Sequence, residues 1–218
     1  MKRLVLIFLM GAICQVSLAQ KLYVETGQSI TAFDYRNSAG GTLDNLLPKA
    51  KTFLSAGYGF QLWGDKGYLL LGASLQNYGA VSSDQLLDNY YEWDVTYAGL
   101  NTGLYYQVSR IREFRFFIKP TLSLEYLLRG TQTLNNQVFS LSGEDEFDNI
   151  LLVPRVGAGV QYPISRKAAL SLTYAFGRSF SLVNNTPEDS EQLNITMHQI
   201  SIGISIVLPG CNCAFNSY

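Results

Sequence analysis

Apolar and polar side chains alternate along residues 116–129. One set of alternate positions holds Phe116, Ile118, Pro120, Leu122, Leu124, Tyr126 and Leu128. The other set carries three charged residues, Lys119, Glu125 and Arg129, among threonine and serine. Because successive side chains of a strand point to opposite faces, this segment predicts a strand with one apolar and one polar face. It is longer than the roughly 9–11 residues with which a tilted strand crosses a bilayer.

Seven further segments repeat this alternation. With the first, they cover residues 21–34, 51–63, 68–79, 93–108, 116–129, 151–163, 168–180 and 196–208. Their polar faces are mostly Gly, Ser, Thr, Asn and Gln, whereas a soluble barrel or sandwich would turn a Lys- and Glu-rich face to water. Small uncharged residues suit the crowded lumen of a narrow membrane barrel. The pattern therefore predicts an all-β, eight-stranded, antiparallel up-and-down transmembrane β-barrel. The alternative is a soluble lipocalin-like barrel or sandwich.

The predicted connections alternate between short and long. The short ones are 64–67, 109–113 and 164–167, and the long ones are 35–50, 80–92, 130–150 and 183–195. Basic residues gather at the short turns, and acidic residues, including Glu92 and Asp94, gather in or beside the long loops. Short periplasmic turns and long external loops are typical of outer-membrane barrels, so we expect both termini in the periplasm.

Composition and the N-terminus agree with export. The chain has 218 residues, and 15% are charged, against about 25% in soluble domains. Residues 1–19 have the features of a signal peptide: Lys2 and Arg3, an apolar stretch, and a small residue at Ala19. That stretch is too short to serve as a membrane-spanning helical anchor. We expect a barrel over 20–208 and a periplasmic tail over 209–218, with no nucleic-acid partner.

Five charged residues fall on the inward phase of the predicted strands. They are Glu25, Lys119, Glu125, Arg129 and Arg155. If 130–150 closes a regular hairpin, Glu125 lies roughly opposite Arg155. Removing one partner of such a partly desolvated ion pair would leave the other charge uncompensated. Two interpretations remain open: an ion-pair network that fills a narrow lumen, or a gate and selectivity element for small ions.

Two cysteines, Cys211 and Cys213, lie in the predicted tail. Export exposes them to an oxidising compartment, where thiols pair. A disulfide across one intervening residue is strained and relatively reducible. The pair is therefore a candidate disulfide or a candidate covalent link to a partner protein.

The loop 130–150 holds a run of carboxylates. Glu144, Asp145, Glu146 and Asp148 supply hard oxygen ligands for a divalent cation. The run lacks the spaced, glycine-bent pattern of a dedicated calcium loop. It predicts a weak cation-binding loop at most, and the sequence predicts no defined metal site and no cofactor.

The single histidine, His198, is the natural candidate for catalysis. By alternation it shares its face with Ile200, and Ser201 points to the opposite side. Nucleophilic catalysis needs a base within hydrogen-bond reach of the nucleophile. We therefore predict a non-enzymatic protein; a lipid-modifying barrel enzyme is a less favoured alternative.

The signal sequence ending in Ala19-Gln20, the eight alternating strands and the motifs KPTLSLEYLLRG and PRVGAGVQY resemble small outer-membrane β-barrel proteins of Bacteroidota. They also resemble the transmembrane domain of OmpA-like proteins of Gram-negative bacteria. The resemblance implies contact with outer-membrane lipid and lipopolysaccharide. It implies a structural or interaction role, as an accessory subunit of a larger secretion or uptake complex that contacts other outer-membrane or periplasmic proteins. A narrow ion or solute channel gated by the lumen charges is the alternative. One departure is that strand 196–208 is followed by Pro209-Gly210 and a tail, instead of ending on an aromatic residue.

Overall fold

The computed structural model describes residues 20–36, 46–84, 89–135, 137–141, 150–181 and 192–208. The expected signal peptide (1–19) and tail (209–218) lie outside these ranges, as do Cys211, Cys213 and the carboxylates of 144–148. The strands are β1 Gln20–Arg36, β2 Leu46–Trp63, β3 Gly67–Asp84, β4 Asn89–Ile111, β5 Phe114–Leu134, β6 Gln137–Ser140, β7 Leu151–Pro163, β8 Ala168–Arg178, β9 Phe180–Ser181 and β10 Gln192–Val207, with a 3-10 turn, η1, at Gly64–Lys66. No helix within these ranges is long and apolar enough to cross a membrane.

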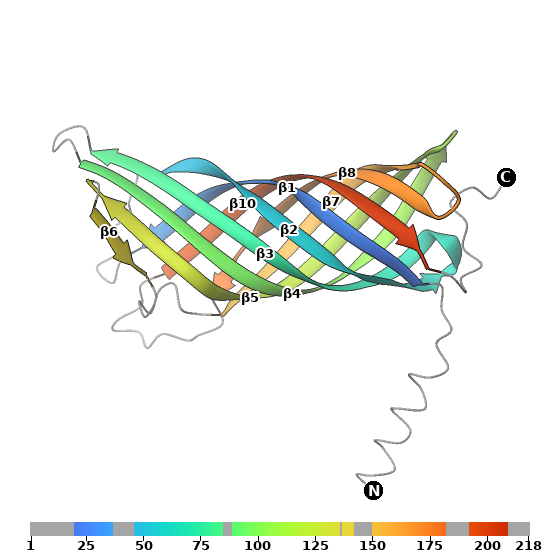
Figure 1. Cartoon of the computed structure of the whole chain (residues 1–218), viewed down its shortest axis with the longest axis horizontal. Coiled ribbons are helices and arrows are strands. Elements are labelled where there is room, and N and C mark those ends of the chain that lie inside the picture. The colour runs from blue at the N-terminus through green and yellow to red at the C-terminus, as the bar shows by residue number, and fades with distance from the viewer. Residues whose placement is uncertain are drawn as a thin grey trace, which may run out of the picture.

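The strands close into a ring (Figure 1). Each long strand pairs antiparallel with its sequence neighbour, β5 pairs with β7 across the β6 excursion, and β10 returns to pair with β1. The two short strands are additions, since β6 pairs with β5 and β9 pairs with β7. The prediction of an eight-stranded antiparallel up-and-down transmembrane barrel is confirmed.

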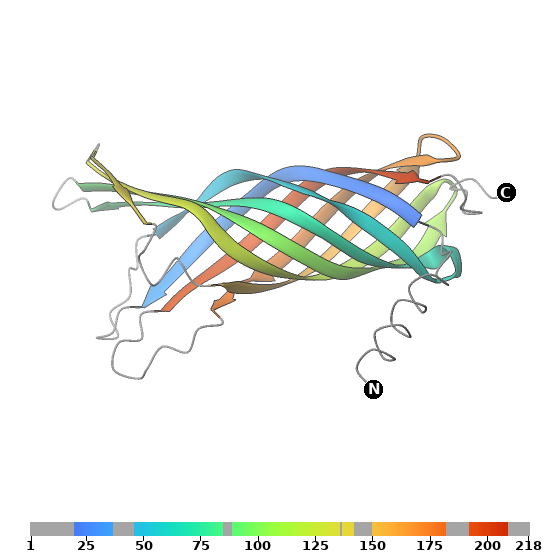
Figure 2. The same ribbon diagram turned by 60° about the horizontal axis from the view of Figure 1, so that its bottom comes forward.

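The pairing register is strongly staggered around the ring. The stagger can be followed from Lys21 of β1 by moving from each residue to its partner on the next strand around the ring. The path passes through Lys21, Gly59, Leu70, Gly103, Thr121, Arg155, Gly177, Met197 and Thr31. The path returns to β1 ten residues beyond its start, at Thr31 instead of Lys21. A stagger of this size requires strongly tilted strands, which Figure 2 shows, and an interior that side chains can fill.

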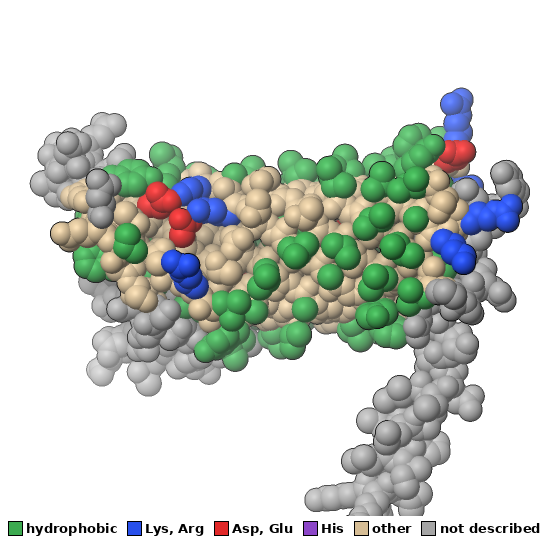
Figure 3. Space-filling model, viewed as in Figure 1, with side chains coloured by type: hydrophobic (Ala, Val, Ile, Leu, Met, Phe, Trp, Pro, Cys, Tyr) green, Lys and Arg blue, Asp and Glu red, His purple; other side chains and the backbone are tan. Residues whose placement is uncertain are grey.

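The outer surface of the barrel is apolar (Figure 3). All seven residues of the apolar face of 116–128 are exposed, and elsewhere Leu100 is 70% and Val156 66% exposed. The alternate residues are buried, among them Ser55, Ser123 and Thr173. This inversion of the soluble arrangement is what a bilayer requires, because the outward side chains meet hydrocarbon.

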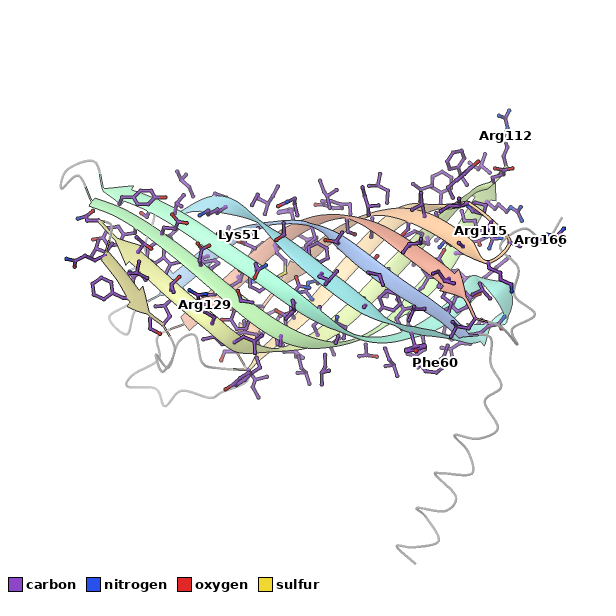
Figure 4. The ribbon with its side chains drawn as sticks, in the orientation of Figure 1. Lys51, Phe60, Arg112, Arg115, Arg129 and Arg166 are labelled. Carbon is purple, nitrogen blue, oxygen red and sulfur yellow. The ribbon has the colours of Figure 1, made fainter. Side chains whose placement is uncertain are left out.

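The two ends of the barrel differ. Figure 4 shows Arg112, Arg115 and Arg166 together at the end that carries the short turns. The β4–β5 turn there contains only Arg112 and Glu113, and Arg112 has a φ of 56°, as tight hairpins require.

At the other end, β3, β4 and β5 run further than expected. The sequence predicted a loop over 130–150, but β5 continues to Leu134 and turns at Asn135 (φ 46°) into β6. Glu92 likewise lies on β4 and not in the loop predicted over 80–92, whereas Asp94 lies on a strand as predicted. These strands extend because each continues to pair with a neighbour that is equally long.

Candidate functional site

Two apolar clusters occupy the lumen, one toward each end. The inner cluster, toward the short turns, consists of Tyr23, Tyr68, Leu70, Tyr105 and Phe117. The outer cluster consists of Phe33, Tyr78, Ala80, Val95, Tyr97, Leu127, Leu141, Leu151, Val153, Ile195 and Met197. Between them lies a polar layer that contains most of the charged residues predicted to face the lumen. Both clusters are buried, so apolar side chains flank the polar layer on each side along the barrel axis.

Aromatic contacts hold the inner cluster together. Tyr105 stacks on Phe117 with the ring centroids 4.7 Å apart, and its hydroxyl donates to Gln161 Oε1 at 3.0 Å. The Lys21 ammonium lies over the Tyr68 and Tyr105 rings, 4.3 and 4.0 Å from their centroids. A buried ammonium is tolerated there because the ring faces carry negative charge density. Lys21 therefore helps to close this end of the lumen.

The central polar contact joins Glu125 of β5 to Arg155 of β7. Arg155 Nη2 lies 2.5 Å from Glu125 Oε1 and donates to Tyr78 Oη at 2.7 Å. Tyr78 Oη in turn donates to Glu125 Oε2 at 2.7 Å, and Arg155 Nη1 donates to Ser123 Oγ at 2.7 Å. Arg155 Nε points to the sulfur of Met197 at 3.3 Å. Both carboxylate oxygens and all three guanidinium nitrogens thus have partners, which a buried ion pair needs if it is not to destabilise the fold.

A second ion pair lies closer to the inner cluster. Lys119 Nζ is 2.6 Å from each carboxylate oxygen of Glu25. A cavity of about 50 Å³ lies beside it. Its lining combines both side chains, Arg155 and several Ser, Thr, Asn and Gln residues with the apolar residues Phe53, Leu70 and Ala175. A polar space of this size holds a few water molecules. The polar layer therefore holds two ion pairs around a small cavity with room for water, between the two apolar clusters.

Four of the five predicted lumen residues lie inside the barrel, and one does not. Arg129 is exposed on the outside. The pairing of β4 with β5 shifts between Thr96 and Tyr97, which pair with Arg129 and Leu127, so Leu128 bulges from the ladder. A bulge adds one residue to one strand and reverses the alternation beyond it. The prediction that Arg129 faces the lumen was therefore wrong.

The predicted contact between Glu125 and Arg155 forms, although the two residues are offset along their strands. Glu125 is in register with Leu151, and Arg155 is in register with Thr121. The two residues are not directly opposite, and the long arginine side chain bridges the offset. Sequence reasoning also missed Tyr78 as a partner, although Tyr78 is in phase with Ser74 and Gln76 on β3 and alternation would have placed it inside.

A charged cluster lies on the outer surface near the ends of β2 and β4. Lys49 pairs with Glu92, and Lys51 pairs with Asp94. Tyr90 Oη donates to Glu92 Oε2 at 2.9 Å. The hydrogen bond from Lys49 holds the pKa of Glu92 below its usual range, although partial burial opposes the shift. These residues form a belt of alternating charge beyond the apolar surface.

His198 lies on the outward face of β10. Its Nδ1 is 2.7 Å from Tyr174 Oη, and its ring packs on Phe176 with centroids 5.2 Å apart. Ser201 is buried in the lumen. Within the described residues, no group of three or more His, Cys, Asp or Glu side chains is placed to hold a metal ion.

No protein-family model and no curated protein matches the sequence. Several solved structures follow a similar chain path. Neisserial surface protein A is 12% identical, covers 86% of this chain and 97% of its own, and gives a TM-score of 0.49. OprG from Pseudomonas aeruginosa is 12% identical, with coverages of 87% and 97% and a TM-score of 0.44. Ail from Yersinia pestis is 12% identical, with coverages of 87% and 100% and a TM-score of 0.42. These similarities carry no assignment of a role to this chain, and its closed antiparallel barrel is established by its own strand pairing.

Proposed function

We propose that this protein is a non-enzymatic outer-membrane barrel with a closed lumen, which anchors an extracellular β-sheet for interaction with another protein. The observation that carries the proposal is the continuation of β3, β4 and β5 beyond the apolar surface, where β6 joins them. In this proposal a cleaved signal peptide exports the chain, and both termini lie in the periplasm. We also propose that the protein belongs with the small outer-membrane barrels of Bacteroidota, on the basis of the motifs KPTLSLEYLLRG and PRVGAGVQY.

The filled lumen supports an anchoring role over transport. The inner and outer clusters bury aromatic and aliphatic side chains at both ends of the polar layer. A conducting pore needs a continuous polar path, and eight strands enclose a space that side chains can just fill. The buried pair Arg155–Glu125 and the partly buried pair Lys119–Glu25 then fix the packing of the interior.

The projecting sheet supports the interaction role. On β6, Val138 is 67% and Phe139 47% exposed, and they point to opposite faces of the strand. Tyr90 of β4, whose side chain is 45% exposed, lies on the same projecting sheet. Exposed apolar side chains on a strand outside the membrane are suited to a protein partner.

The test is a native pull-down of the full chain from detergent-solubilised outer membranes. We expect a stoichiometric partner that the Val138→Ser/Phe139→Ser variant loses. The Ile111→Ser variant, which removes a 61% exposed side chain at the opposite rim, is expected to retain the partner. Equal recovery with all three chains would reject the projecting sheet as the interface. Recovery with and without reductant tests Cys211 and Cys213, since loss on reduction is the result expected of a covalent link.

A narrow channel is the second candidate, and the charged cavity beside Glu25 and Lys119 favours it. It requires the inner or outer cluster to open. Planar-bilayer recordings decide between the two functions. Discrete conductance that changes in Glu25→Gln would support the channel, and a silent bilayer with folded protein would support the closed anchor.

A further inference from the structure

The lumen carries an excess of positive charge. Among the described residues, its charged side chains are four cations and two carboxylates: Lys21, Arg115, Lys119, Arg155, Glu25 and Glu125. Arg115 belongs to this set because it is 7% exposed and in phase with the buried Phe117 on β5, toward the end with the short turns (Figure 4). Charges interact more strongly in a protein interior than in water, so this imbalance favours the uptake of an anion.

Two of these cations line one small cavity. The cavity of about 50 Å³ beside the Glu25–Lys119 pair is lined by Lys119 and Arg155, and Glu25 is the lumen carboxylate that joins them. Glu125 does not line it, and the two oxygens of Glu125 accept hydrogen bonds from Arg155 and Tyr78. The charged groups that meet at this cavity are therefore two cations and one carboxylate. A space that holds water molecules also admits a halide ion, which is only slightly larger.

The lining of the cavity has hydrogen-bond donors in reserve. The contacts described above use two of the three N–H groups of Lys119 and four of the five of Arg155, which leaves one N–H on Lys119 Nζ and one on Arg155 Nη1. Thr173 also lines the cavity; it is 2% exposed, and its Oγ1 has no hydrogen-bond partner among the described residues. A buried donor without an acceptor destabilises the fold, so these three groups favour an acceptor within the cavity.

Two strong acceptors of the lining are already engaged. Both oxygens of Glu25 accept from Lys119 Nζ at 2.6 Å, and Gln76 Oε1 accepts from Gln199 Nε2 at 2.9 Å. A water molecule brings two O–H donors that need acceptors of their own, whereas a halide ion accepts several hydrogen bonds and donates none. The balance of donors and acceptors therefore agrees with the balance of charge in favouring an anion.

We propose that this cavity binds one chloride ion, held by Lys119 Nζ, Arg155 Nη1 and the Thr173 hydroxyl. The ion offsets the positive charge of the lumen and lies between two cations that face the same cavity. It links β5, β7 and β8 through these three side chains and stabilises the interior of the barrel. The site is separate from the projecting sheet and does not depend on a protein partner.

The first test locates the ion directly. Crystals of the full chain are grown in sodium bromide, because bromide replaces chloride and scatters X-rays anomalously. We expect an anomalous peak inside the cavity, within hydrogen-bond distance of Lys119 Nζ and Arg155 Nη1. Anomalous peaks on the surface alone, with only water in the cavity, would overturn the proposal.

The second test measures the effect of chloride on the unfolding equilibrium. Urea titrations of the full chain are run at constant ionic strength, with chloride replaced stepwise by gluconate, which is too large for the cavity. A ligand that binds only the folded state raises the ratio of folded to unfolded protein, by about tenfold for each tenfold rise in ligand concentration once the site is saturated. Thr173→Val keeps the shape of the side chain and should reduce this dependence on chloride. Lys119→Met should abolish it.

Thr31→Val is the matched control for Thr173→Val. Thr31 is also buried in the lumen, but its hydroxyl donates to the Gly79 carbonyl at 2.7 Å, and Thr31 does not line the cavity. This variant is expected to lose stability at every chloride concentration and to keep the chloride dependence of the wild type. The heat-dependent shift in gel mobility of folded barrels verifies that each variant is folded. A stability of the wild type that does not depend on chloride, or a dependence that both Thr173→Val and Lys119→Met retain, would overturn the proposal.

Discussion

Arg155 and Glu125 form an ion pair at the centre of the barrel, although the residue in register with Arg155 lies four positions away from Glu125. The pair is enclosed, with side chains only 5% and 0% exposed. The Tyr78 hydroxyl accepts from the guanidinium and donates to the carboxylate, which links the pair to β3. Three strands are thus held by one polar contact in the middle of the lumen.

We therefore predict that Arg155→Ala lowers the free energy of unfolding by about 3–5 kcal/mol, because it leaves the Glu125 carboxylate buried without its counter-charge. Arg178→Ala removes an exposed contact, 3.6 Å from Asp34, and is expected to cost below about 1 kcal/mol. Urea titrations of the refolded barrel, followed by tryptophan fluorescence, measure both. Equal costs for the two variants would contradict a buried pair. The double variant Glu125→Leu/Arg155→Met, which removes both charges, should recover much of the loss.

The alternation along the chain was sufficient to predict the barrel. Seven apolar side chains on one face of 116–128 have no counterpart in a soluble strand that turns charge to water, and all seven are exposed. Alternation alone predicted that four charged side chains face the lumen. The structure brings them together in two pairs, Glu25 with Lys119 and Glu125 with Arg155.

Alternation fails to predict which side chains face the lumen wherever a β-bulge adds a residue to one strand of a pair. Arg129 differs from Glu125 by an even number of positions, yet the bulge at Leu128 turns it to the opposite side. Alternation would likewise place Lys51 on the inward face with the buried Phe53, but its ammonium pairs with Asp94 on the outer surface. A register shift in the pairing of β2 with β3 lies between Pro48 and Phe53. The position of a bulge depends on how two neighbouring strands pair, and the stagger between strands depends on how the whole ring closes. The alternation within a single strand therefore predicts neither the bulges nor the stagger.

The outward turn of Arg129 has a measurable consequence. Arg129→Ala should change the free energy of unfolding in detergent by at most about 0.5 kcal/mol, as expected of a surface position. Lys119→Met should cost about 2 kcal/mol, because it leaves the Glu25 carboxylate partly buried without its ammonium. The same urea titration compares them. A large cost at Arg129 would place its guanidinium in the lumen, as the sequence first suggested.

Glycine is required where β2 and β3 approach each other beneath Tyr23. A methyl group on Gly72 would lie 2.4 Å from the Ala56 carbonyl oxygen, 2.6 Å from Tyr23 Oη and 3.0 Å from Gly57 Cα, so the β2 backbone as well as the buried tyrosine would have to move. Gly72→Ala is therefore expected to cost about 1–3 kcal/mol, the usual range for overpacking. Gly157→Ala is the matched control, since its nearest neighbour would be 3.3 Å away. Similar costs at both positions would argue against a close contact with Tyr23.

The ion pair between Lys49 and Glu92 should make stability depend on pH in the acid range. The hydrogen bond from Lys49 lowers the pKa of Glu92, and partial burial opposes this only in part. A carboxyl whose pKa is lowered by folding contributes stability above its unfolded pKa of about 4.3, and the contribution disappears as pH falls through the folded pKa. The free energy of unfolding of the wild type should therefore exceed that of Glu92→Gln by up to about 1 kcal/mol at pH 7, and the difference should vanish toward pH 3. Lys49→Met should give the same curve as Glu92→Gln. A difference that persists at pH 3 would mean that Glu92 acts through packing, and not through its charge.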